Sequence, residues 1–392
     1  MRPKPLIVLS SVIANKPLNG GNARMVLNWL EGLERLGADV FLIEQLASET
    51  CVDDAGGPTV AGESANRRYF ESVLQAHRFG DRAALVCDAG DTLAGATIHG
   101  STAAELDDLA RDADLLINIS GHLSVPSLRQ RFRRKAYIDL DPGYTQFWHA
   151  GSAGAARLED HDVYFTVGQR IGTSDCTIPT GGIGWKPMRQ PIVLDDCMVT
   201  QPTSVDRFTT IASWRGAFAP VTHEGETYRV KAHEFRKIVE LPRVSDYSFE
   251  AALDIHPGDS RDLNDLRAAG WDVVDPREVA DTPRRYCTYI DESAAECSAA
   301  QGMYVQTRSG WFSDRTARYL AAGKPVLVQD TGFTVPGSGE GLLVFATLTD
   351  AAAGADRIAC DYRAHSEAAR FLAERYFDST TELGRLLEQA GV

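Results

Sequence analysis

Residues 309–333, SGWFSDRTARYLAAGKPVLVQDTGF, decide the fold, because they join a helix to a buried strand between two polar loops. The helical part carries small apolar residues on one face and ends at Gly323, a residue typical of helix C-termini. Lys324 and Pro325 then lead into the apolar strand 326–328, which stops at the polar loop 329–332. A unit of this kind belongs to a parallel α/β sheet, whose polar loops line a crevice.

The start of the helix in this stretch is a candidate phosphate site. Free N–H groups and the positive end of the helix dipole attract anions there. Ser313 adds a hydroxyl and Arg315 a guanidinium for charge-assisted hydrogen bonds. An ordinary capped helix with Ser313 as N-cap is the alternative interpretation. We predict a nucleotide-linked substrate bound by Ser309, Gly310, Trp311, Phe312, Ser313, Asp314, Arg315 and Thr316.

Length and composition indicate a folded protein of two domains. The chain has 392 residues, of which 44% are hydrophobic and 24% charged, within the ordinary range for globular proteins. The net charge of −14 argues against broad binding to nucleic acid or to anionic membranes. Seven scattered cysteines without a C-x-x-C pair predict reduced thiols, no zinc site and a cytoplasmic location. We see no apolar segment of the roughly 18 residues that a membrane span needs.

Strand and helix patterns alternate along both halves of the chain. In the first half, apolar runs such as 6–12, 39–44 and 83–87 alternate with amphipathic helices such as 23–36. The polar, proline-containing segment from about 186 to 206 breaks this pattern, and a second series begins after it. Repeated β-α units predict parallel sheets covered by helices. The expected fold class is therefore α/β, with two Rossmann-like, doubly wound domains facing a cleft.

Several stretches resemble a known family. DLDPGYTQFWHAG (139–151), FTTIASWRG (208–216), EGETYRVKAHEFRKIVELP (224–242) and YVQTRSGWFSDRTARYLAAGKPVLVQDTGF (304–333) are similar to bacterial glycosyltransferases of the GT-B fold, of the group called family 1-like. The resemblance touches both halves of the chain. It implies an acceptor domain over residues 1–195, a nucleotide-sugar domain over 196–365, and a C-terminal helix within 366–392 that packs back on the first domain.

The resemblance also implies roles for the second half. In GT-B enzymes the loop after the signature strand contacts the donor sugar, which here points to Gln329, Asp330, Thr331 and Gly332; a polar turn is the alternative. Many retaining members carry a glutamate that binds the ribose at the position that Arg318 occupies here. The ribose contact is then expected elsewhere, with Asp314 as a candidate. The family uses no metal or separate cofactor, and no metal-ligand cluster is visible in the sequence.

The segment Ser213–Gly216 follows the first strand of the second half. Because the carboxyl ends of parallel strands form the ligand crevice, Arg215 is a candidate phosphate ligand, with Trp214 beside it. Lys231 begins the next helix, and the two cations together are candidates to stabilise a departing diphosphate. Surface ion pairs with nearby glutamates are the alternative for both.

Candidate residues in the first half follow its strands. Gly20, Gly21 and Asn22 come after the first strand and allow close backbone approach to a sugar or phosphate, or they form a tight turn. His122 and Asp141 are the two candidates for a general base that deprotonates the acceptor hydroxyl. A loop histidine and an Asx-turn aspartate are the structural alternatives. Tyr144 is a candidate for stacking on a sugar, or for core packing.

We expect a glycosyltransferase that moves a sugar from an NDP-sugar to a small-molecule acceptor without a metal. Two other functions stay open: a GT-B-like sugar-nucleotide epimerase or phosphorylase, and a non-catalytic nucleotide-sugar-binding protein. An epimerase needs no acceptor, and a binding protein gives no turnover. We expect no nucleic-acid partner and no membrane span.

Overall fold

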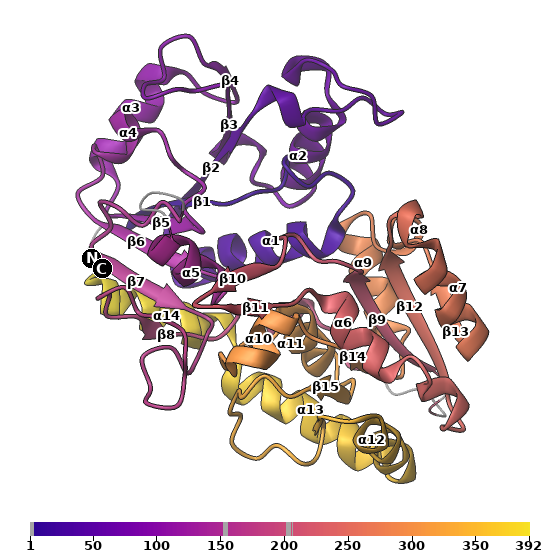
Figure 1. Cartoon of the computed structure of the whole chain (residues 1–392). Helices are drawn as coiled ribbons and strands as arrows, with labels where there is room; N and C mark the ends of the chain where they lie inside the picture. Colours follow the sequence, from indigo (N-terminus) through magenta and orange to yellow (C-terminus); the bar gives the residue numbers. More distant parts are fainter. Residues whose placement is uncertain (1–3, 152–155, 201–204, 206) are drawn as a thin grey trace.

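The computed structural model describes residues 4–151, 156–200, 205 and 207–392, which form two lobes that pack against each other (Figure 1). The N-lobe is built on an eight-stranded sheet with strand order β4-β3-β2-β1-β5-β6-β7-β8. Neighbouring strands in it are parallel except β3 and β4, which are antiparallel. Its strands are β1 (Leu6–Ser10), β2 (Asp39–Leu46), β3 (Ala83–Cys87), β4 (Thr97–His99), β5 (Leu115–Ile119), β6 (Lys135–Asp139), β7 (Val163–Thr166) and β8 (Lys186–Pro187).

The inner N-lobe strands are buried on both faces because helices cover them. Every residue of β3 (AALVC) and β5 (LLINI) is buried, as continuous apolar runs in parallel sheets require. The helices of this lobe are α1 (Gly20–Arg35), α2 (Ala65–Ala76), α3 (Ala103–Asp112), α4 (Pro126–Arg129) and α5 (Tyr144–Gly151).

The C-lobe is built on a six-stranded parallel sheet with strand order β13-β12-β9-β14-β15-β16. Its strands are β9 (Arg207–Ser213), β12 (Ser248–Asp254), β13 (Trp271–Val274), β14 (Ala295–Ser298), β15 (Val326–Gln329) and β16 (Leu342–Phe345). Its helices are α6 (Lys231–Phe235), α7 (Ser260–Ala269), α8 (Pro276–Val279), α9 (Pro283–Asp291), α10 (Gly302–Thr307), α11 (Asp314–Ala321), α12 (Leu348–Cys360) and α13 (Tyr362–Tyr376).

Two segments join the lobes. A small hairpin of β10 (Val221–His223) and β11 (Glu226–Tyr228) leaves the C-lobe and packs on α5, where Tyr228 stacks on Phe147 with ring centroids 4.7 Å apart. The predicted linker contains β8 and a short 3-10 turn at Leu194–Asp196, while its residues 201–204 and 206 lie outside the described residues. The hairpin therefore gives the lobes a contact besides the linker.

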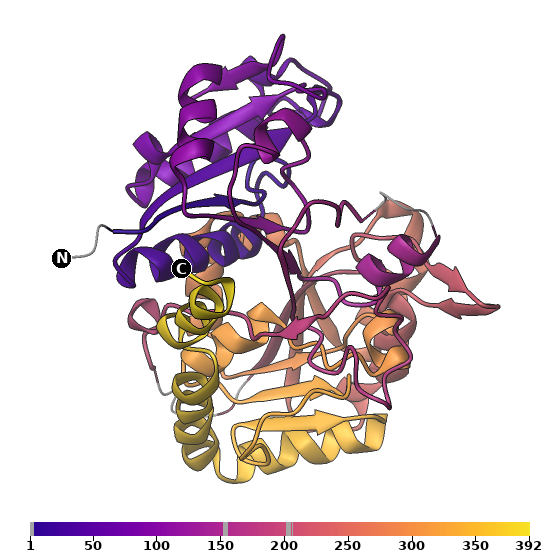
Figure 2. The ribbon, with the colours of Figure 1, turned by 90° about the vertical axis from the view of Figure 1, so that its left-hand side faces the viewer.

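The C-terminal region forms two helices rather than one. Helix α13 packs against α11 of the C-lobe, whereas α14 (Ser379–Ala390) packs against α1 of the N-lobe. A Cβ added at Gly32 of α1 would lie 2.7 Å from Leu383 Cδ1, so the two helices approach closely. Figure 2 shows these C-terminal helices, in yellow, extending from the C-lobe to α1. The chain thus returns to the N-lobe between α13 and α14.

Candidate active site

A cavity of about 550 Å³ lies between the lobes. Its walls come from segments that directly follow strands: the loop after β1, Asp141 after β6, Ser213 at the end of β9 and Gln301 after β14. The carboxyl ends of parallel strands from both sheets therefore meet at one cavity, the usual place for ligands in open α/β sheets. The chemistry-bearing residues that line it are Lys16, Asn19, Gly21, Asn22, Asp141, Lys231, Asp254, Arg277, Tyr286, Gln301, Tyr304, Trp311, Ser313, Asp314 and Arg315.

The N-terminus of α11 forms part of the C-lobe wall. Ser313 is the N-cap residue, and its side chain makes no capping hydrogen bond. Asp314 and Arg315 follow it on the cavity lining. Burial raises the pKa of Asp314, while the adjacent Arg315 opposes that shift. The first turn of α11 thus presents its dipole, a hydroxyl and a guanidinium to the same space.

Arg315 is held in place by a buried glutamate. Its Nε donates to Glu296 Oε1 at 2.7 Å, and its Nη1 donates to the carbonyl oxygen of Ile211 at 2.7 Å. Glu296 is 0% exposed on β14, so this ion pair is shielded from solvent. Within the described residues, Nη2 of Arg315 has no protein acceptor. Arg315 is therefore oriented by the protein and keeps a donor for a ligand.

Lys231 begins α6 and lines the cavity close to Arg315. Its backbone N–H donates to Gln301 Oε1 at 2.7 Å, which fixes the start of the helix. Gly216, in the loop after β9, has a φ of +83°, which favours glycine, and an added Cβ would lie 1.7 Å from Gln301 Nε2. Burial and the charge of Arg315 lower the pKa of Lys231 to about 7. A ligand with negative charge would raise it again.

Asp141 is the carboxylate on the N-lobe wall of the cavity. Tyr304 of the C-lobe donates its hydroxyl to Asp141 Oδ1 at 3.0 Å, so both lobes contribute to this position. Burial raises the pKa of Asp141 to about 6, against the lowering effect of Lys16. A carboxylate with this pKa is ionised at neutral pH and still basic enough to accept a proton.

The turn that carries Asp141 is fixed by a neighbouring aspartate. Asp139, at the end of β6, is fully buried and accepts hydrogen bonds from Thr145, Gln146 and Thr166 at 2.7–2.8 Å. It also accepts the backbone N–H of Asp141 at 3.1 Å. Of the two aspartates in DLDPG, the first therefore holds the backbone and the second faces the cavity.

The loop after β1 is anchored by a second buried carboxylate. Glu44, which is 0% exposed on β2, accepts the backbone N–H groups of Ile13, Ala14 and Asn15 at 2.6–2.8 Å. Burial raises its pKa to about 7, although these three donors oppose the shift. Lys16 follows directly and lines the cavity.

The three predicted residues Gly20, Gly21 and Asn22 have different environments. Gly20 donates its N–H to the carbonyl oxygen of Ala280 at 2.9 Å, and a Cβ there would lie 2.1 Å from the Thr282 carbonyl oxygen. It serves contact between the lobes and does not line the cavity. Gly21 and Asn22 do line it, and the backbone N–H of Asn22 is capped by Asn19 at 3.0 Å.

Several predicted residues of the C-lobe lie outside the cavity lining. Arg215 makes a bidentate ion pair with Asp259 at 2.7 and 2.8 Å, and its side chain is 61% exposed. Trp214 is buried in the C-lobe core and donates its indole N–H to Asp262. Arg318, at the position of the family glutamate, pairs with Asp291 and is also buried.

The loop after β15 is occupied by contacts within the protein. Gln329 donates to Glu234 at 2.5 Å and accepts the N–H of Ala300 at 3.1 Å. Asp330 accepts hydrogen bonds from Arg308 and from the backbone N–H of Gly332, while Thr331 donates to the Trp311 carbonyl oxygen.

These contacts hold the loop against the segment before α11. In that segment Ser309 and Phe312 are buried, and Gly310 donates its N–H to the Thr331 carbonyl oxygen. Thr316 is buried on α11.

The other two N-lobe predictions also lie off the cavity lining. His122 sits after β5, where burial, Lys16 and Arg157 lower its pKa to about 4. It is therefore a much weaker base than Asp141 at neutral pH. Tyr144 is 0% exposed and packs among aromatic residues, with the ring centroid of Phe218 at 4.8 Å. The structure thus favours Asp141 over His122 at the cavity.

Some residues that line the cavity, or that hold a lining residue in place, had no sequence prediction. Lys16 was overlooked, although it lies in the polar loop after the first strand, where ligands bind. Glu296 and Tyr304 gave no local signal, because their importance comes from partners 19 and 163 residues away. Trp311, which was predicted, lines the cavity with its ring stacked on Tyr304 at 4.5 Å.

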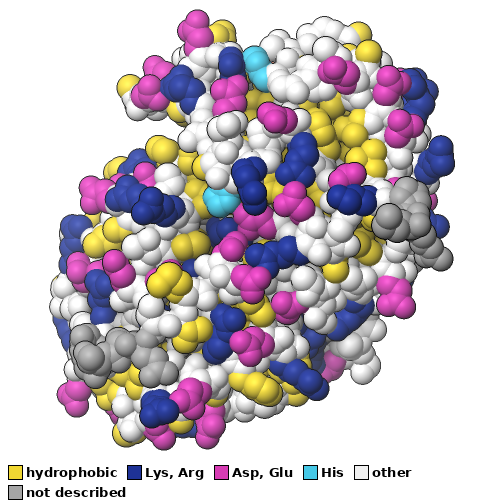
Figure 3. All heavy atoms as spheres, turned by 180° about the vertical axis from the view of Figure 1, so that it is seen from behind, with side chains coloured by type: hydrophobic (Ala, Val, Ile, Leu, Met, Phe, Trp, Pro, Cys, Tyr) yellow, Lys and Arg dark blue, Asp and Glu magenta, His cyan; other side chains and the backbone are white. Residues whose placement is uncertain are grey.

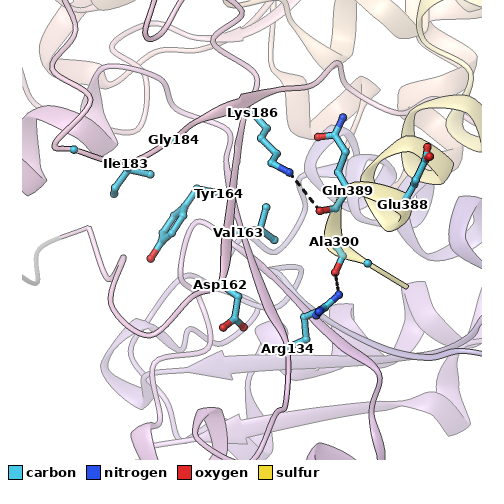
Figure 4. Close-up of a pocket in the computed structure, with 12 residues that line it drawn as sticks. Arg134, Asp162, Val163, Tyr164, Ile183, Gly184, Lys186, Glu388, Gln389 and Ala390 are labelled. Atoms are coloured by element: carbon cyan, nitrogen blue, oxygen red, sulfur yellow. Dashed lines mark hydrogen bonds between the residues drawn. The ribbon is translucent and has the colours of Figure 1, made fainter.

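A second cavity of about 550 Å³ lies at the edge of the N-lobe sheet, between β7, β8 and the end of α14. Figure 4 shows its two basic side chains turned toward the helix end: Lys186 donates to the Gln389 carbonyl oxygen at 3.3 Å, and Arg134 donates to that of Ala390. Cations at a helix C-terminus stabilise it. Because its two cations already bind the helix, we place the candidate active site in the cavity between the lobes.

No metal-binding cluster of three or more His, Cys, Asp or Glu side chains is found among the described residues. Over the same residues, no helix has the length and apolar character needed to cross a membrane. All seven cysteines are free thiols.

Solved glycosyltransferases have the same architecture as this chain. HepE from Anabaena in complex with UDP-glucose aligns with a TM-score of 0.61 and 12% identity, covering 98% of this chain and 99% of that one. Sucrose-phosphate synthase from Thermosynechococcus elongatus aligns with a TM-score of 0.53 and 13% identity, covering 98% and 99%. An alpha-glucosyltransferase in complex with UDP and a 13-mer DNA aligns with a TM-score of 0.58 and 10% identity, covering 99% and 100%.

These similarities establish the fold. The chain has the GT-B fold, two Rossmann-like lobes facing a cleft, and this confirms the fold class expected from the sequence. No protein-family model and no curated protein sequence matches the chain. The assignment of the fold therefore depends on the three-dimensional comparison, which extends over almost the whole chain.

Proposed function

We propose that the protein is a glycosyltransferase that moves a sugar from an NDP-sugar to a small-molecule acceptor in the cavity between the lobes. The observation that carries the proposal is the placement of oriented positive groups on one wall and a basic carboxylate on the other. The fold is shared with a protein whose structure contains UDP-glucose, which supports a nucleotide-sugar donor.

The C-lobe wall would bind the donor diphosphate. The N-terminus of α11, the free Nη2 of Arg315 and the ammonium of Lys231 converge on one part of the cavity. Diphosphate gains negative charge as it leaves the sugar, and pre-oriented positive groups stabilise that charge in the transition state. Glu296 contributes indirectly by holding Arg315 in position.

Asp141 would act as the general base. It accepts the proton of the acceptor hydroxyl while the hydroxyl oxygen forms a bond to the anomeric carbon of the sugar. The bond from that carbon to the diphosphate oxygen breaks, and its electron pair leaves with the NDP. Tyr304 orients the Asp141 carboxylate through its hydrogen bond. Because Tyr304 belongs to the C-lobe, this hydrogen bond also fixes the position of Asp141 relative to the donor site.

A small molecule is the acceptor that fits this chain best. The alpha-glucosyltransferase in complex with UDP and DNA shows that another protein of this fold binds nucleic acid. Here the net charge is −14, and Figure 3 shows acidic and basic side chains interspersed over one face of the molecule. DNA binding needs a continuous basic surface, because phosphate contacts supply most of the affinity.

A thermal-shift screen with UDP-, GDP- and dTDP-sugars tests the proposal. A ligand that binds only the native state raises the melting temperature. At 100 times its Kd it adds about 2.7 kcal/mol to the free energy of unfolding. We expect at least one donor to do so, and chromatography to detect free NDP when an acceptor is supplied. The absence of a shift with every NDP-sugar, or a product formed from the donor alone by epimerisation, contradicts the proposal.

A further inference from the structure

Lys16 is a cation on the N-lobe wall of the cavity, close enough to Asp141 on the same wall and to Asp314 on α11 for its charge to oppose the raised pKa of both carboxyl groups. It makes no ion pair with any carboxylate in the described part of the chain. The preceding residues 13–15 are fixed by their three hydrogen bonds to the buried Glu44, and the Lys16 N–H donates to the Ile13 carbonyl oxygen at 3.2 Å. The backbone that presents this ammonium is therefore rigidly anchored.

Arg157 provides a second cation on the same edge of the N-lobe. Its Nη1 donates to the Gly121 carbonyl oxygen at 3.5 Å, and a Cβ added at Gly121 would lie 2.8 Å from Arg157 Cβ, so the arginine packs beside His122. Like Lys16, it has no acidic partner among residues 4–151, 156–200, 205 and 207–392. Burial is the largest cause of the lowered pKa of His122, and the charges of Lys16 and Arg157 are the next two causes, so the imidazole lies near both cations.

Unpaired cations are informative in a chain with this composition. The sequence has 54 acidic and 40 basic residues, and most of its arginines pair with a carboxylate. Lys16 lines the same wall as Asp141 without such a partner, and it leaves positive charge where the acceptor would lie. Arg157 lies outside the cavity lining, beside His122. Positive charge that faces a cavity is complementary to an anionic ligand.

We propose that the acceptor carries an anionic group, a phosphate or a carboxylate, which Lys16 binds with support from Arg157 while Asp141 faces the acceptor hydroxyl. This inference rests on the proposed function, because it assigns the N-lobe wall to the acceptor. It names the substrate class as sugar phosphates, sugar acids or other hydroxylated anions of similar size. A neutral sugar or alcohol would leave the Lys16 ammonium without an ion-pair partner in the cavity.

Anion binding to the NDP-saturated protein tests the inference. The NDP occupies Lys231 and Arg315, so an added small anion reports on the N-lobe wall. Inorganic phosphate and acetate are titrated separately, and amide NMR shifts of residues 13–22 are followed. We expect saturable shifts with at least one of them, and the tighter anion indicates whether the acceptor group is a phosphate or a carboxylate. Lys16→Gln is expected to raise that Kd at least tenfold, and Arg157→Gln to raise it by a smaller factor.

Matched controls separate this inference from the proposed function. Lys16→Arg keeps the charge and should bind the anion within threefold of the wild type, and Lys186→Gln, at the second cavity, should leave binding unchanged. Lys16→Gln should weaken NDP binding less than it weakens binding of the small anion. If no NDP binds the wild type, the proposed function fails, and the same titration on the nucleotide-free Lys231→Gln variant still tests Lys16. No saturable shift at residues 13–22, or equal affinity in Lys16→Gln, overturns the inference.

Discussion

Replacing Arg315 and Arg215 in parallel distinguishes the donor site in the structure from the one expected from sequence alone. Both arginines follow polar loops of the C-lobe, and both were predicted to bind phosphate. Arg315 faces the cavity with a free Nη2, whereas Arg215 is bound to Asp259 and is 61% exposed. We therefore expect Arg315→Met to weaken NDP binding and Arg215→Met to leave it unchanged.

The size of the effect follows from the contact that is lost. A hydrogen bond to a charged group contributes about 1.5–3 kcal/mol, which corresponds to a Kd increase of roughly 10- to 150-fold. The single variant also leaves Glu296 buried without its partner, at a cost of about 3–5 kcal/mol in the free energy of unfolding. The double variant Arg315→Met/Glu296→Gln removes that buried charge and should recover much of the stability. It should not recover NDP affinity.

Isothermal titration calorimetry with the NDP selected by the thermal-shift screen measures the affinities, and chemical denaturation measures the stabilities. Arg215→Met is the exposed control, since surface ion pairs contribute about 0–1 kcal/mol to stability. The reasoning is refuted if the double variant binds NDP as tightly as the wild type, or if Arg215→Met loses affinity as strongly as Arg315→Met.

Three further predictions concern the cavity and the lobe contact. The pKa of Lys231 is about 7 in the empty site and rises beside a diphosphate, so NDP binding at pH 8 should take up a proton, and NDP affinity should fall by up to about tenfold per pH unit above 7. Calorimetry in two buffers measures the proton uptake, and an unchanged uptake in Lys231→Met contradicts this assignment. Asp141→Asn should lower kcat by about 10²–10⁴-fold without changing NDP affinity. Because only the ionised carboxylate accepts a proton, the wild-type kcat/KM should rise with pH through about 6, and a flat pH profile would contradict the role of Asp141 as the base. Gly20→Ala should lower the free energy of unfolding by about 1–3 kcal/mol, because the added Cβ would lie 2.1 Å from the Thr282 carbonyl oxygen. Gly184→Ala, where the added Cβ would meet open space, should leave the free energy of unfolding unchanged. Equal free energies of unfolding for the two variants would show that the contact between the lobes adjusts without cost.

The strands and the fold class were predictable because the information is local. The apolar run at 83–87 coincides with β3, since it is bounded by polar or helical segments. The expected single C-terminal helix is divided at Phe377, because Asp378 caps a new helix by accepting the N–H of Thr381 at 2.9 Å. That cap is a local signal, and it identifies where the chain returns to the N-lobe.

The composition of the site was only partly predictable because side-chain partners are distant in sequence. Arg215 has its charge satisfied by Asp259, 44 residues later, and Gln329 by Glu234, 95 residues earlier. The helix N-terminus with Ser313 and Arg315 was identifiable, since its position after a polar loop is encoded locally. Which cation is free and which is paired depends on tertiary packing, and no spacing rule in one sequence contains that information.

A structure of the protein in complex with its best-binding NDP shows directly where the diphosphate binds. We expect the diphosphate between the lobes, within hydrogen-bonding distance of the first turn of α11 and of the side chains of Lys231 and Arg315. A nucleotide bound at the second cavity, or a diphosphate that contacts neither cation, would contradict it.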